Sequence, residues 1–157
     1  MLDVGQPAPD FTLPDQHGQE VTLSRLKGTP VVLYFYPKDD TPGCTKEACA
    51  FRDARALYEK AGATVVGVSP DTVASHKKFA DKYELSFTLI ADTDKAVCQS
   101  YGVWQEKSMY GKKSWGVVRT SFLIDGDGIV RRVFRRVKVD GHADEVLAAI
   151  AGLSAPH

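Results

Sequence analysis

The sequence has no excess of either charge, because 20 lysines and arginines balance 20 aspartates and glutamates among its 157 residues. Proteins that bind nucleic acid or an anionic membrane surface are usually basic, so this balance argues against both kinds of partner. No apolar run approaches the roughly 20 residues of a membrane-spanning helix. The first nine residues contain neither the basic nor the apolar segment of a signal peptide, which predicts a cytoplasmic protein.

Cysteine is also scarce, with only Cys44, Cys49 and Cys98 in the chain. In a cytoplasmic protein, so few cysteines indicate redox chemistry or metal binding rather than a framework of structural disulfides. The zinc-binding patterns are missing, since the chain has no Cys-x-x-Cys and no pair of histidines at ligand spacing. We therefore expect no bound metal and no other cofactor.

The order of apolar and polar segments predicts one α/β domain over residues 3–154. Two apolar segments, Val31–Tyr36 and Thr64–Ser69, show no polar alternation, as expected of strands buried on both faces of a sheet. A helical pattern follows each of them, and a short β-hairpin precedes the first. A second hairpin, Val117–Phe134, and a closing helix, Asp140–Leu153, complete the chain. This order predicts a mixed central β-sheet flanked by helices, an arrangement that resembles the thioredoxin fold.

Local signals add four finer expectations. The helix that starts at Pro42 is expected to continue to about Gly62. Asp71 is expected to cap the next helix, and His142 is expected to be exposed in the first turn of the closing one. The segment from Gly102 to Gly116 has no clean period, which predicts a long loop.

The most informative stretch follows the first buried strand. Thr41 is a good N-cap residue, and Pro42 suits the first helical position, where its missing N–H costs nothing. Cys44 is then the third residue of the helix, beside free backbone N–H groups that stabilise a thiolate. The alternative is a small buried thiol without chemistry, which is what most free cysteines are. The capped helix start favours a reactive Cys44.

The same residues carry a family resemblance. Pro37, Thr41 and Cys44 match the Pro-x-x-x-Thr-x-x-Cys signature of the peroxiredoxins, and the wider run Phe35–Cys49 resembles the bacterioferritin-comigratory, or peroxiredoxin Q, branch. The resemblance spans essentially the whole chain and implies a thioredoxin-like fold that opens with a β-hairpin. It also implies a thiol peroxidase that reduces hydrogen peroxide and alkyl hydroperoxides through a cysteine sulfenic acid, with thioredoxin as reductant and often as a monomer.

A peroxidase needs a thiolate, donors that align the peroxide, and positive charge where the leaving group develops. Cys44 supplies the thiolate, the Thr41 hydroxyl can reach both sulfur and peroxide, and Pro37 is expected to shield the site from water. Arg119 interrupts an apolar strand, where a lone arginine needs a partner, and its place matches the peroxiredoxin active-site arginine. By resemblance, Glu47 orients that arginine; an ordinary exposed helix glutamate is the alternative.

A sulfenic acid on Cys44 condenses with a second thiol, called the resolving cysteine. Cys49 is the expected resolving cysteine by spacing and by resemblance. Cys98 lies in an apolar helix pattern, which predicts a buried and inert thiol. Two other functions compete with the peroxidase. A thioredoxin-like disulfide exchanger would need Cys-x-x-Cys, which is missing, and a redox-regulated holdase would leave Thr41, Cys44 and Arg119 without a role.

Overall fold

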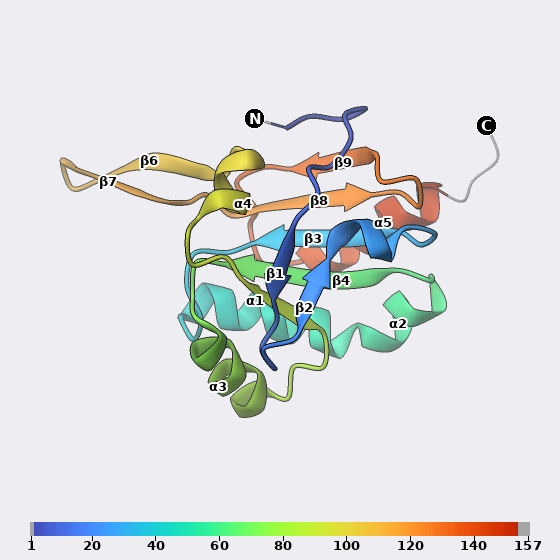
Figure 1. Ribbon diagram of the computed structural model, residues 1–157, viewed down its shortest axis with the longest axis horizontal. Helices are drawn as coiled ribbons and strands as arrows, with labels where there is room; N and C mark the ends of the chain where they lie inside the picture. Colours follow the sequence, from blue (N-terminus) through green and yellow to red (C-terminus); the bar gives the residue numbers. More distant parts are fainter. Residues whose placement is uncertain (1, 154–157) are drawn as a thin grey trace.

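The computed structural model describes residues 2–153 and contains a five-stranded sheet in the order β5-β4-β3-β8-β9 (Figure 1). Its central strand, β3 (Val31–Phe35), pairs in parallel with β4 (Thr64–Ser69) and antiparallel with β8 (Thr120–Ile124). The outer strands are β5 (Thr88–Ala91), parallel to β4, and β9 (Val130–Phe134), antiparallel to β8. The mixed central sheet expected from the sequence is confirmed, while residue 154, the predicted end of the domain, lies outside the described residues.

The side chains of β3 alternate between two separate core clusters, one on each face of the sheet. Val32 and Tyr34 join a cluster that packs against the long helices, and Leu33 and Phe35 join the cluster on the opposite face. The first face is covered by α1 (Pro42–Asp53), α2 (Arg55–Lys60), α3 (Val73–Tyr83) and α5 (His142–Leu153). The second is covered by the hairpin β1 (Thr12–Pro14) and β2 (Glu20–Thr22), the 3-10 helix η1 (Leu23–Leu26) and α4 (Ala96–Ser100).

Gly67 of β4 makes room for one of the largest core side chains. It is the register partner of Tyr34, and a Cβ atom at Gly67 would lie 2.9 Å from the Tyr34 ring. No ordinary contact is that short, so a side chain here would displace Tyr34. In the space that Gly67 leaves, the Tyr34 ring stacks on Phe51 of α1, with centroids 4.8 Å apart. This contact connects the sheet to the helix that carries Cys44.

The prediction of a long loop from 102 to 116 is wrong, because this segment forms most of a β-hairpin. β6 (Trp104–Met109) pairs antiparallel with β7 (Lys112–Val117), and the hairpin projects from the body of the molecule (Figure 1). Tyr110 and Gly111 at its tip both have positive φ, at 53° and 77°, as a type I′ turn requires. The sequence signal was weak because tyrosine stands where asparagine or aspartate usually marks such a turn.

Three other local expectations also need correction. The helix from Pro42 breaks at Ala54 into α1 and α2, and beyond the break Tyr58 donates a hydrogen bond to the Ala143 carbonyl of α5 (2.8 Å). His142 is buried rather than exposed, because its ring bonds to the Ser121 hydroxyl of β8 at 2.7 Å. The cap of α3 is Thr72, one residue after the expected position.

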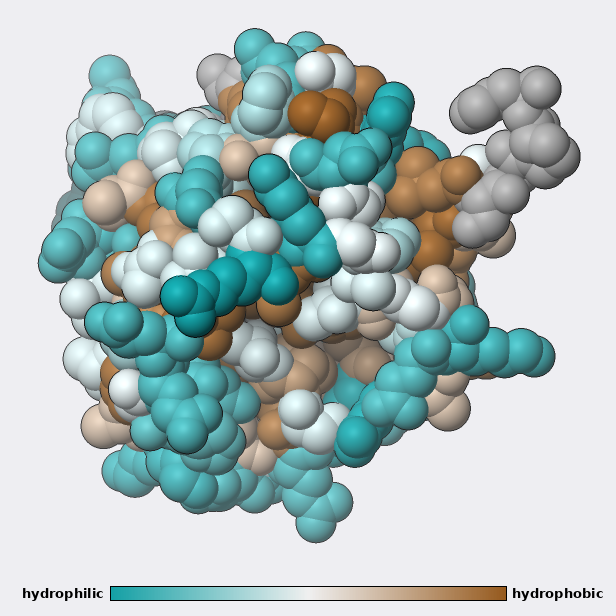
Figure 2. Space-filling view, turned by 45° about the vertical axis from the view of Figure 1, so that its right-hand side comes forward, coloured by the Kyte–Doolittle hydropathy of each residue, from teal (hydrophilic) through white to brown (hydrophobic). Residues whose placement is uncertain are grey.

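Polar side chains predominate on the face shown in Figure 2, where the apolar ones form separate patches. None of the helices among residues 2–153 combines the length and apolar character needed to cross a bilayer. The large apolar side chains that remain exposed in this part of the chain are Val4, Leu57, Tyr110 and Trp115.

Candidate active site

The start of α1 places Cys44 where the sequence predicted, as the third helical residue and almost completely buried. Pro42 is the first helical residue, and the first helical hydrogen bond runs from Thr45 N–H to the Thr41 carbonyl at 2.8 Å. The N–H groups of Gly43 and Cys44 therefore precede the helical ladder. They lie at the positive end of the helix, where they can donate to an anion.

Thr41 occupies the N-cap position, but its side chain does not cap the helix. Its hydroxyl instead donates to the carbonyl oxygen of Lys38, 2.8 Å away. The predicted helix start, with Thr41 at the N-cap position and Pro42 as the first helical residue, is confirmed. A hydroxyl has one proton and two lone pairs, so the Thr41 oxygen keeps accepting capacity for another ligand.

Arg119 joins Cys44 to Glu47. Its Nη2 donates to the Cys44 sulfur at 3.1 Å, and its Nη1 donates to Oε1 of Glu47 at 2.6 Å. Arg119 lies between the end of β7 at Val117 and the start of β8 at Thr120, so the single strand expected through this region is interrupted. The structure thus brings together residues that are up to 75 positions apart in the chain.

The Glu47 side chain is fully buried, which rules out the exposed alternative. Burial raises the pKa of Glu47 to about 7, although attraction and hydrogen bonding to Arg119 act to lower it. Burial also acts to lower the pKa of Arg119, but Glu47 and Cys44 outweigh it and raise that pKa. Among the described residues, the second carboxylate oxygen of Glu47 and the buried Tyr34 hydroxyl have no hydrogen-bond partner.

Lys107 adds a second positive charge that the sequence did not indicate. Its stem follows Gly116 of the neighbouring strand, where an added Cβ would lie 3.5 Å from the Lys107 Cδ. Burial lowers the pKa of Lys107, the Arg119 charge lowers it further, and Cys44 acts in the opposite direction. The charge of Lys107, on β6, therefore interacts with those of Arg119 and Cys44. The signal was hidden because the segment was interpreted as a loop.

The three cysteines lie in different environments. Cys49 is half-buried in α1, on the same helix as Cys44, and no disulfide joins any of the three. Cys98 is fully buried in α4, as predicted. Burial raises the pKa of its thiol, and the neighbouring Asp92 raises it further. A thiol in this environment is a poor nucleophile.

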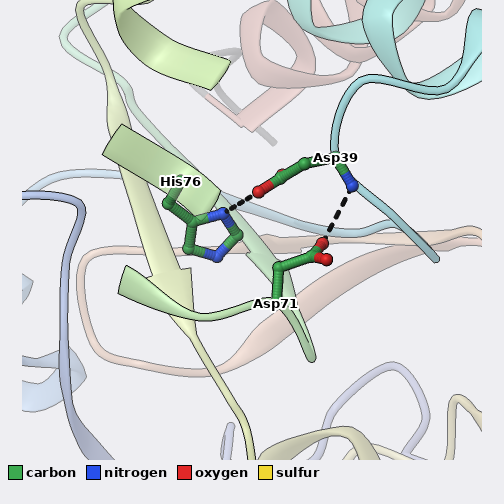
Figure 3. A group of neighbouring side chains, drawn as sticks. All are labelled: Asp39, Asp71 and His76. Carbon is green, nitrogen blue, oxygen red and sulfur yellow. Dashed lines mark hydrogen bonds and ion pairs between the residues drawn. The ribbon is translucent and has the colours of Figure 1, made fainter. Parts of the chain in front are cut away.

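A polar cluster forms where Asp39, in the loop that leads to α1, meets Asp71 and His76 (Figure 3); Asp39 and His76 are buried and Asp71 is half-buried. Their ligand-type atoms lie within 4.8 Å of one another, which is a spacing that could hold a metal ion. Those atoms already take part in hydrogen bonds with one another and with neighbouring groups. The sequence analysis missed this cluster, although His76 is a polar residue on the buried face of α3, three positions before Phe79.

Comparison with known proteins agrees with this geometry. Residues 4–133 match the AhpC/TSA family. The chain is 53% identical over 149 residues to a bcp peroxiredoxin of Coxiella burnetii, covering 95% of this chain and 99% of the relative. It is 48% identical over 146 residues to peroxiredoxin Bcp of Escherichia coli, covering 93% and 94%. The bacterioferritin comigratory protein of Xanthomonas campestris superposes with a TM-score of 0.92 at 41% identity, covering 98% and 100%, which supports the thioredoxin-like fold. The chain therefore belongs to the AhpC/TSA family and is a peroxiredoxin of the Bcp, or peroxiredoxin Q, branch, an oxidoreductase that acts as a peroxidase.

Proposed function

We propose that Cys44 is the peroxidatic nucleophile of this peroxidase. The observation that carries the proposal is the Arg119 guanidinium, which contacts the Cys44 sulfur at 3.1 Å while Glu47 holds its other nitrogen. In the reaction, the Cys44 thiolate attacks the terminal oxygen of a hydroperoxide and the O–O bond breaks. The departing oxygen takes the hydroperoxide proton and leaves as an alcohol or water. The sulfur, now bonded to the terminal oxygen, is left as a sulfenate, which takes a proton from solvent to become the sulfenic acid.

The surrounding groups divide the work of aligning the hydroperoxide. Because the Thr41 proton is given to the Lys38 carbonyl, the Thr41 oxygen is the acceptor for the O–H of the substrate. The N–H groups at the start of α1 and the Arg119 guanidinium are donors for the negative charge that develops on the peroxide oxygens. Pro37, half-buried after β3, is proposed to limit the access of water.

The proposed substrates are hydrogen peroxide and alkyl hydroperoxides. The bacterioferritin comigratory protein of Xanthomonas campestris has alkyl peroxide reduction activity, which supports the second class. The site offers hydrogen-bond donors and positive charge to the O–O bond that all hydroperoxides share, so it does not by itself favour one member of the class. We further propose a cytoplasmic monomer recycled by thioredoxin, a proposal that rests on the family resemblance.

Cys49 is proposed to attack the Cys44 sulfenic acid, which releases water and forms an intramolecular disulfide. Its support is the half-buried thiol on the same helix, compared with the fully buried Cys98. Disulfide exchange and holdase activity are less well supported, because neither uses the contact of Arg119 with the Cys44 sulfur.

Thiol counting tests this function directly. Reduced protein mixed with one equivalent of hydrogen peroxide should lose two free thiols within seconds. Cys44→Ser should lose none on this timescale, because serine is scarcely ionised at neutral pH. Cys98→Ser is the matched control and should still lose two. Thioredoxin-dependent peroxide turnover by Cys44→Ser would remove Cys44 from its proposed role.

A further inference from the structure

The Asp39 carboxylate is the centre of the polar cluster in Figure 3. It accepts hydrogen bonds from the Tyr36 hydroxyl (2.6 Å) and the Ser75 hydroxyl (2.8 Å), and it contacts Nδ1 of His76 at 2.7 Å. The other ring nitrogen, Nε2, lies 2.9 Å from the Ile90 carbonyl, which can only accept, so Nε2 carries a proton. The carboxylate also accepts, so a second proton lies between His76 and Asp39. Hydrogen bonds thus use the ligand atoms that a metal ion would need.

The cluster is connected to Thr41 through a single peptide group. The N–H of Asp39 donates to Oδ2 of Asp71 at 2.8 Å, and the same carboxylate oxygen accepts from the Ser69 hydroxyl at 2.6 Å. The carbonyl of that peptide belongs to Lys38 and accepts the Thr41 hydroxyl. A peptide group is planar, so an N–H fixed at one end also fixes the direction of the carbonyl at the other.

The described hydrogen bonds that tie Asp39 and Asp40 to other elements go to α3 and to Asp71, which follows β4. Besides the bonds of Asp39 to Ser75 and His76, the neighbouring Asp40 accepts from Lys82 (2.8 Å) and from the Tyr83 hydroxyl (2.7 Å), both near the end of α3. Asp40 itself has a left-handed backbone, with φ at 55°, a conformation that needs support from its surroundings. None of these contacts is made by a residue of α1, so an opening of that helix removes none of their partners.

We propose that Asp39, Asp71 and His76 are positioning residues that orient the Thr41 hydroxyl toward the hydroperoxide. None of the hydrogen bonds described for them reaches the Cys44 sulfur, so they act through the Lys38–Asp39 peptide. The inference rests on the proposed role of Thr41 as the acceptor of the substrate O–H. It adds an anchor that keeps this acceptor in place through successive turnovers.

Two substitutions of His76 separate its two contacts. The amide nitrogen of asparagine can replace Nδ1, so His76→Asn keeps the bond to Asp39. The amide nitrogen of glutamine can replace Nε2, so His76→Gln keeps only the bond to Ile90. The rate constant for Cys44 oxidation by hydrogen peroxide should fall at least about tenfold in His76→Gln and less than about threefold in His76→Asn, the scale of losing one aligning contact.

The rate of Cys44 alkylation by iodoacetamide, followed by mass spectrometry of the Cys44 peptide, is measured in parallel. Alkylation needs a reactive sulfur but no aligned hydroperoxide, so it should stay within about twofold in both variants. Equal losses of both rates in both variants, in step with a lower Tm, would show a structural role only and overturn the inference. If the His76 variants do not fold, the half-buried Asp71 gives a second pair: Asp71→Ala should lose peroxide reactivity, and Asp71→Asn should retain it because its amide oxygen still accepts.

A double-mutant cycle with Thr41→Val tests the connection itself. If the cluster acts through Thr41, His76→Gln should cost no further peroxide reactivity once the hydroxyl is removed. Additive losses would overturn the positioning role while leaving the proposed function intact. A Thr41→Val protein with an unchanged peroxide rate would instead contradict the proposed role of Thr41 and remove the basis of the inference.

Discussion

The α1 helix must open for the proposed disulfide to form. Cys44 and Cys49 lie on this one helix, and five residues advance it by about 7.5 Å and turn it by about 500°, which separates the Cα atoms by roughly 8.7 Å. A disulfide requires about 4.4–6.8 Å. The proposed disulfide therefore requires the first turns of α1 to unwind after each oxidation and to re-form after each reduction.

Glu47 makes this opening depend on pH. The polar sequence around Glu47 suggests that the opening costs little free energy. In the structure, however, Glu47 and Ala48 are buried, and the opening breaks the ion pair of Glu47 with Arg119. Because burial raises the pKa of Glu47 to about 7, the closed helix binds a proton more tightly than the open one. The closed form is thus favoured at low pH and loses stability as the pH rises from about 4.5 to about 7, by about 3 kcal/mol in all.

Amide hydrogen exchange measures the opening. After correction for the intrinsic rate, protection of residues 42–49 in the reduced protein should fall on the order of 100-fold between pH 5 and pH 8. Glu47→Gln, which cannot ionise, should show a flat profile, with the amides of β3 as the protected reference. In the disulfide form, exchange over residues 42–52 should rise sharply, and Cys49→Ser should stop as the sulfenic acid with α1 still wound. The same-helix mechanism is wrong if α1 of the disulfide form is as protected as in the reduced protein, and the Glu47 argument fails if Glu47→Gln keeps the pH dependence.

Three further substitutions test the roles of single side chains. Arg119→Ala should slow the oxidation of Cys44 by roughly 10²–10³, the scale for losing one preorganised donor; stopped-flow mixing with hydrogen peroxide measures it, and a loss below threefold would place the cation elsewhere. Lys107→Met keeps the stem but removes the charge, so the same assay should show a loss of roughly threefold to tenfold, the scale of a partly solvated charge; an unchanged rate would mean that this charge does not act on the site. Cys98→Ser should leave thioredoxin-linked turnover nearly intact, and its collapse would make Cys98, rather than Cys49, the resolving cysteine.

The features that the sequence predicted correctly depend on neighbours close in the chain. The start of α1 follows from Thr41 and Pro42 alone, and the buried strands follow from unbroken apolar runs, so both were predictable. The β6–β7 hairpin was missed because Tyr110 has the positive φ of a turn position that asparagine or aspartate usually occupies. The burial of Glu47 was undecided because its partner, Arg119, lies 72 residues away.

The cap of α3 shows how a distant partner decides between two equivalent local signals. Asp71 and Thr72 are both good N-cap residues, and nothing within the helix distinguishes them. Thr72 caps α3 by accepting from Ser75 N–H at 3.1 Å, because the Asp71 carboxylate is already used by Asp39 N–H and the Ser69 hydroxyl. Asp39 reaches Asp71 across 32 residues, from a loop whose position depends on the sheet. Asp71, which has the sequence of a helix cap, thus binds the loop before α1 instead. The sequence could not predict this contact, because the sheet brings the two segments together.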